Sequence, residues 1–61
     1  MDIPIWVVTD PDGVFYRAFK SPESAQHYID TDTQLHACTV SKEWQASQGT
    51  LPPALRRLPI G

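Results

Sequence analysis

The sequence predicts a small α+β fold, ββαβ, in which a three-stranded antiparallel sheet carries one helix on one face and a proline-rich C-terminal tail follows. Three observations carry this prediction. Two apolar stretches flank the turn sequence Asp10-Pro11-Asp12-Gly13, a helix start follows at Ser21-Pro22, and a third strand-like stretch comes later. The chain has 61 residues, which is near the lower limit for folding without a metal or a disulfide.

The turn predicts the first hairpin. Asp10 can accept hydrogen bonds from backbone amides, Pro11 has the φ that the second turn position requires, and Gly13 adopts positive φ at little cost. This is the pattern of a three-residue hairpin loop with a glycine bulge. Such a loop places Val8 opposite Tyr16 if the pairing stays regular.

Regular alternation then sorts the hairpin into two apolar faces. One face carries Ile3, Ile5, Val7, Thr9, Phe15, Arg17 and Phe19. The other carries Trp6, Val8, Val14, Tyr16 and Ala18. A small antiparallel sheet normally leaves one face to water, so two apolar faces predict that the second one needs a cover.

The helix is expected at about 22–30. Ser21 is the expected N-cap and Pro22 fits the first helical position. Ala25, Tyr28 and Ile29 form one apolar stripe. We expect this stripe to dock on the first face, the one that carries Ile5, Val7, Phe15 and Phe19.

A third strand is expected from Leu35 to Trp44, with His36, Cys38 and Val40 on one face. A right-handed crossover through the helix places this strand beside the first one and antiparallel to it. The predicted strand order is therefore 2-1-3, with the second and third strands as open edges.

The chain is expected to divide into a ββαβ domain at 1–46 and a proline-rich tail at 47–61. Three prolines after residue 50 exclude a central strand there. Pro53 fits the start of one helical turn that places Leu55 and Leu58 on a common side. The sequence favours neither of two roles for the tail. The tail either anchors a partner or folds back over the second face of the hairpin.

No catalytic residue, metal site or cofactor is predicted. Cys38, His36 and His27 are the only residues that suggest such chemistry, and they lack the spacing of a zinc site or of an activated thiolate. The net charge of −2 does not favour phosphate neutralisation. No apolar run approaches the roughly 20 residues that span a bilayer, and the N-terminus lacks a signal peptide, so a cytoplasmic location is expected.

The first half of the chain resembles a widespread type of short phage and bacterial protein. The pattern is V-V-T-D-x-x-G-V, followed by F-x-S-x-E-x-A-x-x-Y, and it corresponds to Val7–Val14 and Phe19–Tyr28. The resemblance implies a phage or mobile-element protein in the host cytoplasm. Small proteins in that setting often bind and inhibit a host protein, including CRISPR and other defence components.

The prediction for function is therefore a small, non-enzymatic protein-binding module, with a homodimer as one form. Aromatic side chains on a rigid sheet suit an interface because they bury a large area at small entropic cost. The alternative is a single-stranded nucleic-acid binder that stacks bases on the aromatic sheet face. The predicted partner-binding residues are Trp6, Val8, Tyr16, Arg17, Trp44, Leu55, Arg56 and Arg57.

Overall fold

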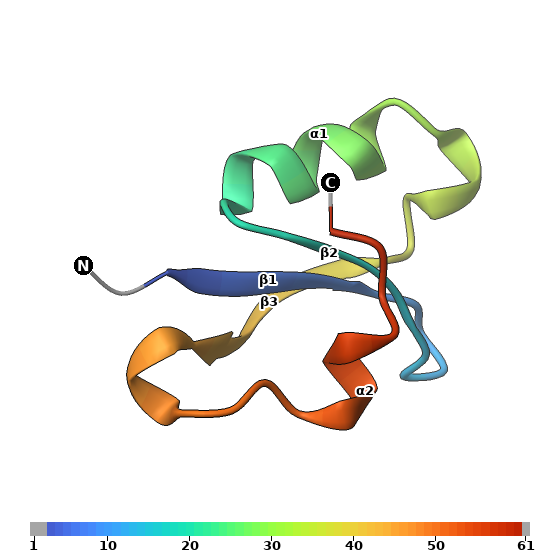
Figure 1. Cartoon of the computed structure of the whole chain (residues 1–61). Helices are drawn as coiled ribbons and strands as arrows, with labels where there is room; N and C mark the ends of the chain where they lie inside the picture. The colour runs from blue at the N-terminus through green and yellow to red at the C-terminus, as the bar shows by residue number, and fades with distance from the viewer. Residues whose placement is uncertain (1–2, 61) are drawn as a thin grey trace.

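The computed structural model describes residues 3–60. The elements are β1 (Pro4–Thr9), β2 (Phe15–Phe19), α1 (Pro22–Asp30), the 3-10 turn η1 (Thr33–Leu35), β3 (Thr39–Gln45), the 3-10 turn η2 (Ala46–Gln48) and α2 (Pro53–Arg56). The strands form one antiparallel sheet in the order β2-β1-β3, which confirms the predicted α+β fold and topology. Figure 1 shows α1 on one side of this sheet and α2 on the other. The outer limits of the two predicted segments, at Met1 and Gly61, lie outside the described residues.

The hairpin turn forms as predicted. One carboxylate oxygen of Asp10, Oδ1, accepts from the backbone amides of Asp12 at 3.0 Å and Val14 at 2.7 Å. The amide of Asp10 donates to the carbonyl of Val14, and Gly13 has a φ of 88°. The turn therefore fixes the start of the pairing between β1 and β2.

The pairing departs from the predicted register one residue after it starts. Thr9 lies opposite Phe15 as expected, but Val8 then lies opposite Arg17 and not opposite Tyr16. Tyr16 is an extra residue in a β-bulge, so every residue of β2 after it changes face relative to regular alternation.

The bulge reverses the predicted helix docking. α1 starts where expected, since the hydroxyl of its N-cap Ser21 accepts from the amide of Ser24 at 3.2 Å. It does not cover the face of Ile5 and Val7, however. Five buried residues form the core on the α1 side: Val8, Phe19, Ala25, Ile29 and Leu35.

The opposite side of the sheet is covered by the tail. Leu55 of α2 is 2% exposed and packs with Ile5, Val7 and Ala18. Phe15, Trp44, Leu51 and Leu58 surround this second cluster. The tail thus folds back, which was one of the two alternatives, but it covers Ile5, Val7 and Ala18 in place of Trp6, Val8 and Tyr16. Both faces of the sheet are covered.

The third strand begins later than predicted, at Thr39 and not at Leu35. Leu35 ends η1, because the Asp32 side chain accepts from the amide of Gln34 at 2.9 Å and starts a tight turn there. A bulge leaves Glu43 without a partner on β1. Trp44 therefore lies on the tail side.

The two sheet edges differ. On β2, the amide of Ala18 donates to the carbonyl of Pro59 at 3.1 Å, and Ile60 pairs with Ala18 in parallel. This edge, predicted to be open, is thus partly covered by the tail. Within residues 3–60 no strand lies along the outer edge of β3, where Lys42 and the bulged Glu43 are exposed. Charges and bulges of this kind discourage edge pairing.

None of the helices in the described part of the chain has the length and apolar character to cross a membrane.

Candidate functional site

An open surface pocket of about 630 Å³ lies between β2 and α1. Its volume falls in the range of small-ligand and side-chain binding sites. The residues that line it are Arg17, Phe19, Glu23, Ser24, His27, Tyr28 and Thr31. We refer to this feature as the Arg17 pocket.

Arg17 is held by two aromatic rings. Its guanidinium carbon lies 5.9 Å from the ring centroid of Phe19 and 5.7 Å from that of Tyr28. The two ring centroids are 5.4 Å apart with an angle of 48° between the planes. Cation–π contacts of this kind contribute about 0.5–1 kcal/mol each at exposed sites. The rings therefore fix the position of a half-buried guanidinium at the surface.

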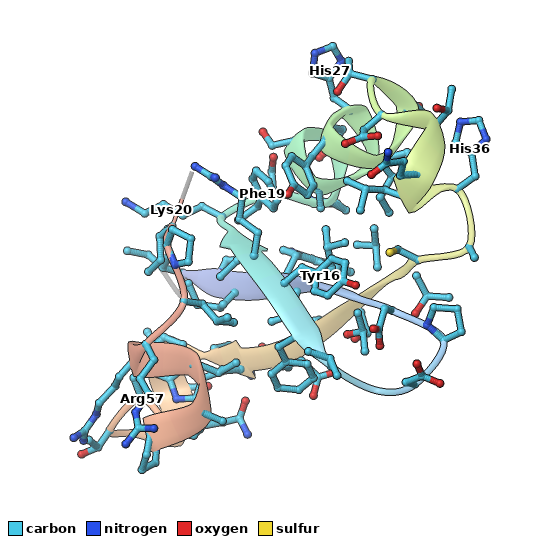
Figure 2. All side chains as sticks on the ribbon, turned by 90° about the vertical axis from the view of Figure 1, so that its right-hand side faces the viewer. Tyr16, Phe19, Lys20, His27, His36 and Arg57 are labelled. Carbon is cyan, nitrogen blue, oxygen red and sulfur yellow. The ribbon has the colours of Figure 1, made fainter. Side chains whose placement is uncertain are left out.

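The local sequence explains why these residues meet. The extra residue Tyr16 turns Arg17 and Phe19 toward α1, where regular alternation would have turned them away. On the helix, Ser24, Tyr28 and Thr31 recur at intervals of three and four residues and so share one side of α1. Figure 2 shows Phe19 between β2 and the helix, with His27 on the outer side of α1.

Tyr16 is the exposed aromatic residue of β2. Its side chain is 43% exposed, and Figure 2 shows its ring on the same side of β2 as Phe19. The carboxylate of Asp10 hydrogen-bonds the Tyr16 hydroxyl and its charge disfavours the phenolate, so the pKa of Tyr16 is raised.

The predicted site residues of the hairpin are only partly brought together. Tyr16 and Arg17 both lie on the exposed α1 side of β2. Val8 is fully buried in the core beneath α1, so it is unable to contact a partner in this fold, and that part of the predicted site is wrong. Trp6 is half-buried against the same core, and its indole Nε1 has no hydrogen-bond partner among the described residues.

The remaining predicted site residues lie on the tail side of the sheet. Leu55 is buried and Trp44 packs half-buried against the same cluster, because the bulge at Glu43 turns it to that side. Arg56 donates from Nε to the carbonyl of Leu51 at 2.9 Å, and Arg57 is exposed. Figure 2 shows Arg57 on α2, across the sheet from His27. These residues do not share a surface with the Arg17 pocket.

The prediction from sequence missed the helix side of the pocket. The residues that line the pocket from this side were not among the predicted site residues: Glu23, Ser24, His27, Tyr28 and Thr31. Tyr28 could have been predicted as a site residue, because it is a large aromatic residue at the edge of the apolar stripe of α1. The stripe alone did not show which strand residues it would meet.

The residues that suggested thiol or metal chemistry remain apart. Cys38 is half-buried against the core, whereas Figure 2 shows His27 and His36 pointing outward from different segments. His36 and Cys38 precede β3, so the predicted shared strand face is wrong. Within residues 3–60 no three side chains capable of binding a metal converge.

Comparison of the chain with protein-family models, with curated proteins and with solved structures finds no match.

Proposed function

We propose that this chain is a non-enzymatic protein-binding module that contacts its target through the Arg17 pocket and the neighbouring ring of Tyr16. One observation carries the proposal: the guanidinium of the half-buried Arg17 lies over two aromatic rings, and Arg17 lines a surface pocket. Arg and Tyr, with Trp, are the residue types most enriched among those that dominate the binding energy of protein interfaces.

The distribution of exposed apolar side chains supports this surface. Among the described residues the large exposed hydrophobic side chains are Ile3, Val14, Tyr16 and Ile60. Val14 precedes β2, Tyr16 belongs to it, and Ile60 pairs with it. Three of the four therefore lie along β2, the strand that contributes Arg17 and Phe19 to the pocket.

The size of the molecule sets a scale for such an interface. A standard protein interface buries about 800 Å² on each partner. The whole surface of this chain is 4124 Å², so a standard interface would take about one fifth of it. Arg17 belongs to both β2 and the pocket, so a patch of this size would include the pocket and the exposed residues of β2.

The test compares site variants on one scaffold. Wild type, Arg17→Ala, Tyr28→Ala and the control Arg57→Ala are immobilised, and the proteins that each retains from an extract of the source cells are quantified. A protein retained by wild type and by Arg57→Ala, but not by the two pocket variants, is then purified and its affinity measured. We expect Arg17→Ala to weaken this affinity roughly 30-fold, which corresponds to about 2 kcal/mol. Equal affinity of wild type and Arg17→Ala would refute the site.

The same wild-type and variant proteins also test the nucleic-acid alternative. A stacking platform of the RNA-recognition type needs an uncovered sheet face, and α1 and the tail cover both faces. Binding of a single-stranded oligonucleotide at low salt, with steep loss as salt rises, would support that alternative over the proposed module. The narrower prediction of a phage protein that inhibits a host defence component rests on the sequence resemblance.

A further inference from the structure

The guanidinium of Arg17 has unused donors. A guanidinium carries five N–H donors in a fixed fork. Within residues 3–60, Arg17 contacts the rings of Phe19 and Tyr28 and forms no hydrogen bond or ion pair. Glu23 lines the same pocket but does not lie within ion-pair distance of Arg17. The rings therefore position the fork at the surface without neutralising its charge.

The helix side adds further donors to the pocket. The Ser24 hydroxyl oxygen accepts from the hydroxyl of Ser21 at 2.9 Å, so its own proton remains free to donate. His27 is also among the residues that line the pocket, with its ring directed outward from α1 in Figure 2. The Thr31 hydroxyl, by contrast, donates to the carbonyl of Tyr28 at 3.1 Å and is already used. Arg17 and Ser24 thus offer free donors in the pocket, whereas Glu23 is its one carboxylate.

We infer that the Arg17 pocket binds one acidic side chain, glutamate or aspartate, from a peptide segment of the partner protein; this inference rests on the proposed function. A carboxylate is the planar acceptor that matches the guanidinium fork in a bidentate pair. Its apolar neighbours in the segment would pack on the exposed part of the half-buried Tyr28 ring.

Glu23 sets a limit on the partner sequence. It is the one carboxylate among the residues that line the pocket, and it would repel a second acidic side chain brought into the same volume. The expected partner segment therefore carries a single acidic residue among apolar or neutral neighbours, and not an acidic run. This requirement for a single acidic residue distinguishes the pocket from basic surfaces that bind any polyanion.

The test is a selection of random heptapeptides displayed on a carrier, with the intact chain as bait and excess Arg17→Gln protein as competitor. We expect the selected peptides to share one acidic position. Each selected peptide is then synthesised with its Glu→Gln or Asp→Asn twin, and both affinities are measured. The acidic peptide should bind wild type at least tenfold more tightly than its neutral twin.

Three proteins make the measurement specific. Arg17→Gln should remove the preference for the acidic peptide, Arg17→Lys should retain only part of it, and Arg57→Gln should leave it unchanged. The Arg17→Lys variant keeps a cation over the rings, so it controls for loss of folding in Arg17→Gln. Amide spectra of each variant establish that the fold is intact.

The outcomes separate this inference from the proposed function. If selected peptides lack an acidic position but lose affinity in Tyr28→Ala, the acidic ligand is wrong and the pocket remains a protein-binding site. Failure to select any peptide, or equal binding of acidic and neutral twins, also overturns the inference. The proposed function itself fails only if a partner binds wild type and the pocket variants equally.

Discussion

Replacement of Leu55 by alanine tests the role of the tail in the fold. Leu55 is 2% exposed and lies at the centre of the cluster on the tail side, against Ile5, Val7 and Ala18. Leu→Ala at buried sites costs about 2–5 kcal/mol. A chain of 61 residues is expected to have a free energy of unfolding of about 3–9 kcal/mol, at roughly 0.05–0.15 kcal/mol per residue. The substitution should therefore remove about half of the stability.

The assay is urea unfolding followed by tryptophan fluorescence, with thermal unfolding as a second measure. For a domain of this size each kcal/mol lowers the midpoint temperature by about 4–8 °C. The midpoint of Leu55→Ala should fall by at least about 8 °C. Arg57→Ala is the matched control, because Arg57 is exposed and lies two residues away; its effect should stay within about 0.5 kcal/mol.

Amide hydrogen exchange shows which part of the structure loses stability in Leu55→Ala. The amide of Ala18 donates to Pro59 at 3.1 Å, so it reports whether the end of the tail is docked on β2. Exchange at Ala18 should become faster in Leu55→Ala than in Ile29→Ala when the two are compared at equal global stability, because Ile29 belongs to the other cluster. Equal stability of Leu55→Ala and Arg57→Ala would refute the packing of the tail on the sheet.

Three further predictions concern the hairpin and the helix start. Ser21→Ala removes the N-cap acceptor of the Ser24 amide and should lower the free energy of unfolding by about 1 kcal/mol, measured by urea unfolding. Gly13→Ala should cost about 1–2 kcal/mol although the site has room for a methyl group, because the residue has a φ of 88°; a neutral result would contradict that conformation. Asp10→Asn should lower the pKa of Tyr16 toward its ordinary value, as followed by the ultraviolet absorbance of tyrosinate. Because the folded pKa of Tyr16 is raised, its stabilising contribution is present below the unfolded pKa and is lost as pH rises through the folded pKa; this alkaline loss should be smaller in Asp10→Asn.

The sequence predicted the elements that depend on local chemistry. The turn at Asp10, the N-cap at Ser21 and the proline at the start of α2 each act through neighbouring backbone groups, and all three appear in the structure. The strand order was also predicted correctly, because a helix that connects two strands running in the same direction leaves few alternatives. Local signals of this kind can be recognised in one sequence without knowledge of the rest of the fold.

The faces of the sheet could not be predicted in the same way. Each edge strand contains one extra residue, Tyr16 in β2 and Glu43 in β3, and neither has a sequence signature that marks a bulge. One inserted residue reverses the facing of every later residue in its strand. The Arg17 pocket was therefore predicted only in part, through Tyr16 and Arg17, whereas its helix side depended on tertiary packing.

The bulge itself suggests why Tyr16 is present. Without Tyr16, the residues of β2 would alternate regularly: Phe15 toward the tail, Arg17 toward α1, Ala18 toward the tail and Phe19 toward α1. These are the sides that they occupy in the structure. Tyr16 is therefore an insertion that the two cores do not require.

Deletion of Tyr16 should accordingly leave a folded protein with a free energy of unfolding within about 1 kcal/mol of wild type. Loss of cooperative urea unfolding in the deletion would show that the bulge serves the fold and not the surface. If the protein folds, partner binding separates the two contributions of this residue. Tyr16→Ser keeps the bulge and removes the ring, so loss of affinity in both variants assigns the contact to the ring. Loss in the deletion alone assigns it to the local backbone twist that the bulge gives β2.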